Sequence, residues 1–544
     1  MVRLLQLQEV IEKALVPEEL YLTLVVAYGL QQALGQLNST VDVGREFRFA
    51  IPISLVPEEV NSLLISAEVA TSGTVSSPSL VETFPFTALP GVPALVQLPH
   101  SLQSISVIDN GVVNNRSVRV VADGPVSVVI QSGRRFGLDS ALIAPVSALG
   151  THYRLMSWGD SIGPGSNVVI AADTDQTVVR ITPKVAAAGR PAGVPFSVNL
   201  ARGEAFHLWA DGDDTDLTGS LVIANKPIAV LSGNTCALVP DLNTDFCDTA
   251  YEQQVPVPRW GTAFVMVPHP NRPNGDRIRV LAHHANTSVF ENGVRLATLV
   301  PGEHHTILRT VATLITTTQP ASVAQFGQGC RADTNPDCHG DPFQLTLEPI
   351  TRWSNRVLLG VHDNGLPNGT VLPLMTIVAP QSAAASVRVN GVAPPPAVFQ
   401  PIANTALVYA QLSRVANTSH LVTADAPIYA SSVGLYSAEA HAHVGAAVRT
   451  GSGGDTLASA DDLLLRLRSN GSRDIGFGVK GVARIDHTVY FQSSDKSIDN
   501  PTRMVADGSG ILVGSAVRNV TAEQDLLFSY RVNSDGIFAD DFED

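Results

Sequence analysis

The stretch SLVIANKPIAVLSGN, at residues 220–234, shows the pattern on which the fold depends. Apolar residues alternate with small or polar ones on both sides of a polar turn, and Pro227 opens the second run. Alternation with a period of two is typical of a β-strand with one buried face. Proline is tolerated at the start of a strand, where its missing N–H does least harm. The stretch therefore predicts two β-strands joined by a tight connection.

The same pattern occurs at three further places in the chain, each around one proline. The copies are VRVVADGPVSVVIQSG at 118–133, TLITTTQPASVAQFGQG at 313–329 and HLVTADAPIYASSVGL at 420–435. The prolines, Pro125, Pro227, Pro320 and Pro427, follow one another at intervals of 102, 93 and 107 residues. Further short alternating runs fill each interval, which makes about seven strands per ~100 residues, as in a β-sandwich. The alternative is a propeller-like arrangement of the repeats.

The repeat divides the 544 residues into six parts. We expect an all-β protein with four tandem antiparallel β-sandwich-like repeats of ~100 residues and a small C-terminal β region. Charged residues make up only 16% of the chain, which suits strands better than long amphipathic helices. The expected boundaries are a leader at 1–40, repeats at 41–152, 153–262, 263–355 and 356–449, and a linker with the C-terminal β region at 450–544.

The four cysteines fall into two close pairs, Cys236 with Cys247 and Cys330 with Cys338. Neither pair has CxxC spacing, and the gap between the pairs matches no common zinc module. The first cysteine of each pair lies nine or ten residues after the proline of its repeat, so both pairs occupy the same inter-unit connection. We expect two short-loop disulfides and an oxidising compartment. Four unpaired buried thiols are the alternative.

The net charge and the N-terminal segment indicate which partners and which location are expected for the protein. The net charge is −15 and no basic stripe occurs, which disfavours nucleic acid as a partner. The apolar run LYLTLVVAYGL at 20–30 is too short to span a bilayer but has the length of a signal-peptide core. Four glutamates stand before this run, at positions 9, 12, 18 and 19, and make the segment an atypical signal peptide. An ordinary amphipathic helix is the alternative. We expect an extracellular or cell-surface protein without a transmembrane segment.

Several distinctive stretches follow one another in order along the chain. They are PVSALGTHY at 145–153, AADTDQT within 168–181, LTGSLVIANKPIAVLSGNTC at 217–236, CDTAYEQQVPVPRWG at 247–261, RVLAHHANT at 279–287 and 324–347 around GDP. On these stretches the sequence resembles, over about 44–445, the amino-terminal domain of IgGFc-binding proteins, with its bacterial relatives. The resemblance implies an extracellular, non-catalytic binding or adhesion module; it does not carry over antibody binding, because the Fc-contacting residues cannot be placed here.

The C-terminal part resembles a different repeat. DDLLLRLRSNGSRDIGFGVKGVARID at 461–486 is similar to a delta-60 repeat, a propeller-type β repeat of secreted bacterial proteins. A partial second copy follows at 504–514 and 525–536, and TGSGGD at 450–455 has the composition of a flexible linker.

The search for chemistry gives no catalytic motif: GxSxG, Walker A, HExxH and GxGxxG are all absent. Three histidine pairs, an acidic loop and four tryptophans are the candidate site residues. Their more ordinary interpretations are solvated or partly buried imidazoles, a solvated acidic turn and core packing. We therefore expect no catalytic residue, cofactor or metal site. The groups are His283 with His284, His304 with His305, His441 with His443, the loop from Asp211 to Asp216, and Trp158, Trp209, Trp260 and Trp353.

These observations predict a secreted or cell-surface, non-enzymatic binding or adhesion protein. Its partner is expected to be an extracellular glycoprotein, glycan or surface polymer, contacted through loops at the ends of the sandwiches. A structural spacer or matrix component is the first alternative, and a carbohydrate-active hydrolase with paired carboxylates is the second.

Overall fold

A computed structural model describes residues 42–448 apart from 54–60, 103–109, 133–136, 164, 271, 333–337, 339, 363–372 and 437–438. Beyond 448 it describes only short strands between 463 and 538. The predicted leader at 1–40 and the linker at 450–455 lie outside the described residues. The described chain is almost entirely antiparallel β-sheet, as the sequence predicts. No helix among the described residues is long and apolar enough to cross a membrane.

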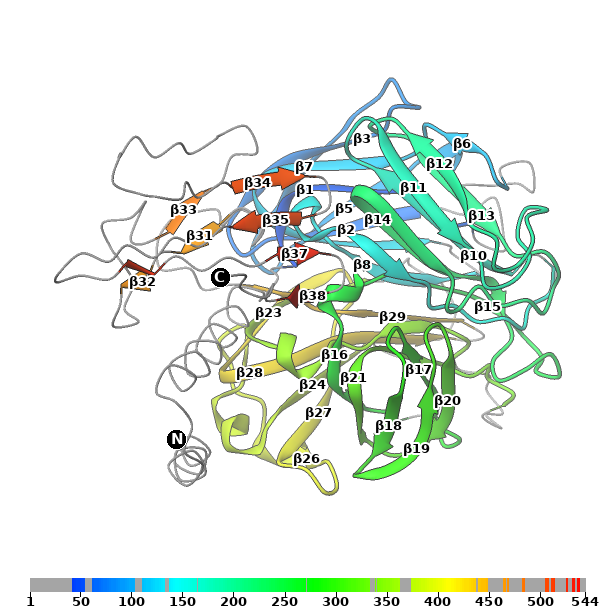
Figure 1. The fold of residues 1–544 in the computed structure, drawn as a ribbon. Helices are drawn as coiled ribbons and strands as arrows, with labels where there is room; N and C mark the ends of the chain where they lie inside the picture. The colour runs from blue at the N-terminus through cyan, green and yellow to red at the C-terminus, as the bar shows by residue number, and fades with distance from the viewer. Residues whose placement is uncertain are drawn as a thin grey trace. The chain divides into compact units, whose positions relative to one another are not determined.

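Four sheets of seven or eight strands follow one another along residues 44–447 (Figure 1). The first contains β1 (Gly44–Phe49), β2 (Asn61–Ser66), β3 (Thr71–Ser76), β4 (Phe84–Ala88), β5 (Ala94–Leu98), β7 (Val118–Ser132) and β8 (Asp139–Ile143). The second contains β6 (Val113–Asn114), β9 (Gly150–Arg154), β10 (Ser166–Ala172), β11 (Thr177–Thr182), β12 (Phe196–Leu200), β13 (Ala205–Trp209), β14 (Leu221–Ala237) and β15 (Asp248–Gln253).

The third and fourth sheets repeat this plan. The third contains β16 (Gly261–Met266), β17 (Asp276–Ala282), β18 (Thr287–Glu291), β19 (Val294–Leu299), β20 (His304–Arg309), β21 (Thr313–Phe326) and β22 (Gln344–Thr346). The fourth contains β23 (Ser354–Val361), β24 (Leu374–Pro380), β25 (Arg388–Val389), β26 (Gln400–Pro401), β27 (Leu407–Ser413), β28 (Thr418–Tyr436), β29 (Glu439–Val444) and β30 (Ala446–Ala447).

Each sheet is organised by one long strand, and here the structure corrects the sequence-based expectation. The stretch around each proline is one continuous bent strand (β7, β14, β21 or β28) and not two strands joined by a turn. In the second sheet the first half of β14 pairs with β9 and β11, and its second half pairs with β10 and β15. The register with β9 shifts between Ile223 and Ile228, so the chain bends at the exposed Pro227 without leaving the ladder.

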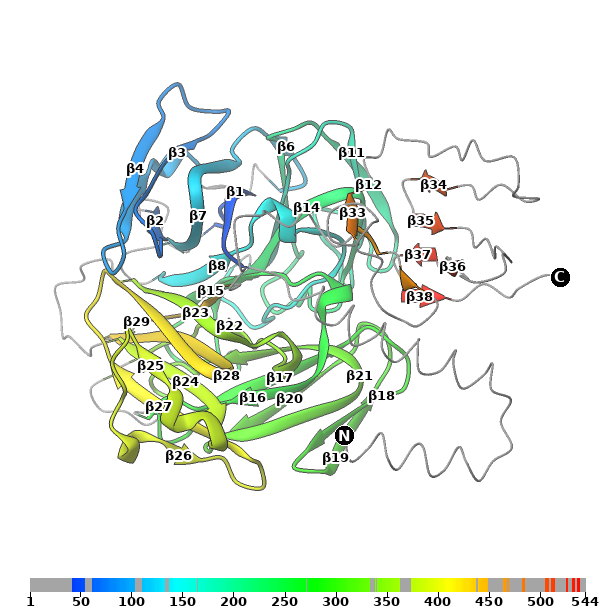
Figure 2. The ribbon, with the colours of Figure 1, turned by 90° about the vertical axis from the view of Figure 1, so that its left-hand side faces the viewer.

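The two halves of the long strand differ in burial. In β14 the first half alternates between buried and partly exposed residues, whereas every residue from Ile228 to Ala237 is buried. The second half is buried beside a hub formed by β8, β15, β22 and β29, one strand from each of the four sheets. β8 contacts β15 and β29, and β22 contacts the same two strands. Figure 2 shows β8, β15 and β22 between the first two and the last two sheets.

The carboxylate of Asp139 joins the four strands of the hub. Oδ2 of Asp139 accepts the backbone N–H of Tyr251, at 2.9 Å, and of Gln344, at 3.1 Å. Oδ1 accepts the N–H of Ser140, at 2.8 Å, and of Ala442, at 3.2 Å. These donors lie on β15, β22, β8 and β29, so each of the four sheets supplies one. Burial raises the pKa of Asp139 well above its usual range, and the four N–H donors act in the opposite direction.

The fourth sheet also reaches back to the first. β30 pairs with β23, and the N–H of Asp42, just before β1, donates to the carbonyl oxygen of Ala447 at 3.1 Å. Arg356 of β23 forms an ion pair with Glu68, which follows β2. The four sheets therefore close around the hub. Each repeat is a unit organised by its own bent strand, and the four repeats meet at the hub.

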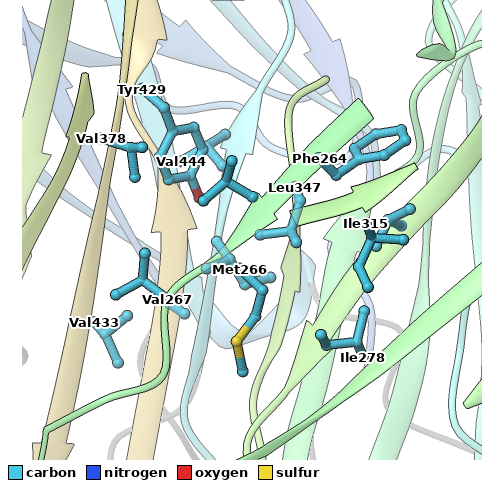
Figure 3. Close-up of a cluster of buried hydrophobic side chains, with 14 of the residues drawn as sticks. Phe264, Met266, Val267, Ile278, Ile315, Leu347, Val378, Tyr429, Val433 and Val444 are labelled. Atoms are coloured by element: carbon cyan, nitrogen blue, oxygen red, sulfur yellow. The ribbon is translucent and has the colours of Figure 1, made fainter. Parts of the chain in front are cut away.

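Apolar cores cross the boundaries between the sheets. Figure 3 shows one that combines Phe264, Met266 and Ile315 of the third sheet with Val378 and Val433 of the fourth. All five side chains are at most 6% exposed. A second cluster combines the first and second sheets, whereas two others stay within the second and the fourth sheet. The repeats therefore have apolar cores of their own and are also joined by cores that cross sheet boundaries.

The short 3₁₀ turns before β9, β16 and β23 lie at equivalent places. They are η3 (Val146–Ala148), η4 (Val257–Arg259) and η5 (Ile350–Arg352), and each follows a proline. The other 3₁₀ turns among the described residues are η1 (His100–Leu102), η6 (Gln381–Ser386) and η7 (Pro396–Val398).

The described strands beyond 448 form three small antiparallel sheets. They are β31 (Leu463–Leu465) with β33 (Val482–Arg484), β32 (Leu467–Arg468) with β36 (Asp525–Leu526), and β34 (Met504–Asp507), β35 (Gly510–Val513), β37 (Arg531–Asn533) and β38 (Gly536–Phe538). The remaining residues of the delta-60-like stretches lie outside the described part of the chain.

Candidate binding site at the disulfide-closed loops

Both expected disulfides are present in the structure. One joins Cys236 to Cys247 and closes the connection from β14 to β15. The other joins Cys330 to Cys338 in the connection from β21 to β22. The two connections are equivalent in the second and third sheets. Each leads from the long strand to a hub strand, so both loops lie at the same end of the hub.

The two loops contact each other. The N–H of Gly329 donates to the carbonyl oxygen of Val239 at 2.8 Å. Arg331 and Asp245 form an ion pair across the loops at 2.9 Å. The Nδ2 group of Asn274, just before β17, donates to the carbonyl oxygen of Ala332 at 2.7 Å. We call residues 238–246 and 327–332, with Asn274 and Arg277, the loop-pair surface.

The loop-pair surface borders an open cavity of about 400 Å³. Its lining is mainly polar and contains two carboxylates and two guanidinium groups. Mixed charges and amide groups in a cavity of this size fit a polar part of a ligand and not a purely apolar one. The principal polar residues of the lining are Asp241, Asp245, Asn274, Arg277, Gln328 and Arg331.

Two apolar side chains stand beside this cavity on the loop that Cys236 and Cys247 close. Leu242 is 50% exposed and Phe246 is 43% exposed, and among the described residues Phe246 is the one aromatic residue in the set of exposed large hydrophobic side chains. The backbone φ of Phe246 is 67°, in the left-handed region, which costs an aromatic residue of the order of 1 kcal/mol. The guanidinium group of Arg331 lies 5.2 Å from the centre of the Phe246 ring. The loop thus holds an exposed aromatic side chain in a strained, braced position.

The other residues singled out from the sequence do not form such a site. Within the acidic loop, Asp216 is engaged: one oxygen accepts the N–H of Thr218 and the other pairs with Arg279 of β17 at 2.7 Å. Oδ2 of Asp211 accepts the N–H of Gly189. Among the residues that the structure describes, no three His, Cys, Asp or Glu side chains are placed to hold a metal ion.

His441 and His443 share one face of β29, as their spacing allows. Their rings stack 6.3 Å apart and both side chains are fully buried. The Nδ1 atoms of both contact Oγ of Ser140 on β8, at 3.1 and 2.9 Å. They connect the fourth sheet to the first. The other histidine pairs, His283 with His284 and His304 with His305, are half-buried.

The four tryptophans are buried, so the packing interpretation of them is right. Their exposed fractions are 3% for Trp158, 4% for Trp209, 8% for Trp260 and 9% for Trp353. None of them offers a flat exposed face on which a sugar could stack. The exposed aromatic residue beside the cavity is Phe246, which no sequence motif indicated.

The matches to known proteins cover the part of the chain that contains this cavity. A family model described as IgGFc binding protein matches residues 139–434, more than half of the 544 residues. The IgGFc-binding protein of Homo sapiens is 28% identical over 182 residues, which cover 32% of this chain but only 3% of the human protein. The family match includes both disulfide-closed loops and every residue of the cavity. On this match, the chain belongs to the IgGFc-binding protein family.

Proposed function

We propose that this chain is a non-catalytic binding module of a secreted or cell-surface protein, and that it recognises an extracellular glycoprotein through the loop-pair surface. The observation that carries the proposal is Phe246. An aromatic side chain held exposed by a strained backbone, a disulfide and an ion pair resembles the anchors that dominate protein interfaces. The name of the human relative indicates a protein partner, the Fc part of immunoglobulin G, for that protein.

Two observations favour this proposal over its alternatives. A spacer is expected to arrange its units in a row, whereas here the fourth sheet bonds back to the first. A glycoside hydrolase needs a buried carboxyl group that keeps its proton. Of the two carboxylates in the cavity lining, Asp241 is exposed and Asp245 is 68% exposed and paired with Arg331.

Three finer points are part of the same proposal. The partner class extends to a glycan or surface polymer if the glycoprotein is recognised through its sugars. The four repeats, divided at 153, 263 and 356, act as one binding unit. The C-terminal region from 450 onward is an appended delta-60-like β region of a bacterial-type relative, and it is not needed for recognition.

The test is binding of the full chain to immobilised extracellular glycoproteins, with immunoglobulin G Fc and mucin among them. We expect Phe246→Ala to weaken binding at least tenfold, because exposed aromatic anchors commonly contribute more than 1.4 kcal/mol. Val294→Ala is the matched control, since Val294 is 65% exposed on β19, away from the cavity lining. Equal binding by the two folded variants would refute the assignment of the loop-pair surface.

A further inference from the structure

The floor of the cavity holds one guanidinium group in a fixed orientation. Arg277 is the second residue of β17, and its Nε donates to Oε1 of Gln328 at 3.1 Å. Gln328 is itself only 2% exposed. Its Nε2 donates to the carbonyl oxygens of Asn274, at 3.2 Å, and Gly275, at 2.9 Å. Every polar atom of this amide is therefore used, and the side chain of Arg277 is held by a buried partner.

The two guanidinium groups of the lining are not equivalent. Arg331 is 61% exposed and already paired with Asp245. For Arg277, no hydrogen bond or ion pair within the described residues engages the two Nη groups. Arg277 is half-buried, and burial lowers its pKa, whereas the charge of Asp241 acts in the opposite direction. The guanidinium group has thus lost hydration without gaining an ion pair. An anionic group of a ligand that accepts hydrogen bonds from these Nη groups would replace the hydration that burial removed.

The nearest acidic group of the lining does not fill this role. Asp241 is exposed at the edge of the cavity, where its Oδ1 accepts the N–H of Asn243 at 2.9 Å. Its charge favours the charged form of Arg277, but no ion pair joins the two side chains. Asp241 therefore remains solvated, whereas Arg277 is oriented and desolvated. Of the two unpaired charges, Arg277 gains more from a partner.

We propose that the cavity binds a carboxylate group of the partner, and that the two Nη groups of Arg277 donate to its two oxygens. A planar guanidinium group matches a carboxylate in this bidentate way, and the rigid support from Gln328 reduces the entropy lost on binding. The inference rests on the proposed function, because it assigns a chemical group to the partner of the same surface. The carboxylate comes either from an acidic side chain or from an acidic sugar of the glycoprotein.

Small probes test this on the full chain. Saturation-transfer NMR is recorded with N-acetylglutamate amide and N-acetylneuraminic acid, and with the neutral probes N-acetylglutamine amide and N-acetylglucosamine. We expect saturation transfer to at least one acidic probe and to neither neutral one. The acidic probe that binds identifies the source of the carboxylate as a side chain or a sugar. Failure of both acidic probes would overturn the proposal.

Three variants separate the charge of Arg277 from general effects. Arg277→Gln should weaken binding of the acidic probe at least tenfold, the loss typical of a charge-assisted hydrogen-bonded pair. Arg180→Gln, at an exposed arginine of β11, should change nothing. Asp241→Asn should strengthen binding, because it removes the negative charge closest to the ligand. Since Asp241 is exposed, this variant folds even if Arg277→Gln does not.

Weaker binding of the acidic probe by Asp241→Asn would contradict the proposal, because a carboxylate bound at Arg277 should be repelled by the charge of Asp241. The outcome is distinguishable from a failure of the proposed function. If Phe246→Ala abolishes glycoprotein binding but neither acidic probe binds, the loop-pair surface is the binding site and the assignment of a carboxylate to Arg277 is wrong. If neither acidic probe binds and Phe246→Ala leaves glycoprotein binding unchanged, both the proposed binding surface and the carboxylate assignment are wrong.

Discussion

Replacing Asp139 with asparagine should destabilise residues 42–448 as a whole, because one carboxylate receives an N–H from each of the four sheets. Asparagine keeps one oxygen, so at most two of the four N–H groups retain an acceptor. The other two face an NH₂ group and remain buried. Each lost hydrogen bond to a charged acceptor costs about 1.5–3 kcal/mol, so we expect a loss of about 3–6 kcal/mol. Domains are typically stable by only about 5–15 kcal/mol.

The assay is equilibrium unfolding in urea, followed by fluorescence of the four buried tryptophans. Trp158 packs against Phe326 of the third sheet and Trp353 packs against Tyr429 of the fourth, so loss of the hub should shift the transition seen by these tryptophans to lower urea. Asp123→Asn is the matched control, since Asp123 is exposed at the bend of β7 and should change stability by less than about 0.5 kcal/mol.

A loss below about 1 kcal/mol would refute the reasoning. Burial raises the pKa of Asp139, and a carboxyl group that kept its proton would be nearly isosteric with the amide. The geometry argues against this, because both oxygens already accept two N–H groups and a proton on either would face no acceptor among these donors. A small effect of the substitution would therefore show that the hub is neutral.

Three further predictions concern the junctions and loops. A Cβ on Gly219 would lie 2.1 Å from a carbonyl oxygen of the third sheet, so Gly219→Ala should lower Tm by several degrees more than Gly293→Ala, which shares a positive φ but meets nothing within 4 Å. Burial lowers the pKa of His443 to about 4, so the folded state keeps this imidazole neutral while the unfolded state binds a proton near pH 6.5. Stability is therefore lost as the pH falls from about 6.5 to about 4. His443→Gln should remove about 3 kcal/mol of this loss, measured by urea unfolding at both ends of the range. A Cys236→Ser, Cys247→Ser double variant should lose about 2–3 kcal/mol, and the oxidised protein should show no free thiol with Ellman's reagent.

The sequence predicts the strands of this fold because alternation is a local signal. The run at 220–234 gives β14, and the equivalent positions of the four cysteines indicate the two loops that form the cavity. At Pro227 the alternation predicts a break between two strands, and this prediction is wrong, because β14 continues through the proline as one bent strand. After Pro227 the sequence still alternates but burial does not, because Ser232 and Asn234 are buried too. Their side chains donate to the carbonyl oxygens of Met156 and Trp158. Contacts between repeats more than 100 residues apart leave no local pattern.

The central residues of the hub and of the cavity carry no sequence signal for the same reason. Asp139 is an isolated acidic residue after a loop, and nothing near it indicates three acceptor contacts with distant strands. Arg277 occupies an ordinary polar position of an alternating strand. Its role depends on Gln328, which lies 51 residues later and is buried by the fold. Phe246 differs only in its exposure and its positive φ, which become visible in three dimensions.

The most direct test of the closed four-sheet arrangement is native-state hydrogen exchange of the full chain, with peptides from β8, β15, β22 and β29 followed by mass spectrometry. If one hub joins the four sheets, these strands should exchange last and with one common free energy of opening. Four different levels of protection, one for each sheet, would show that the repeats unfold independently and would contradict the account.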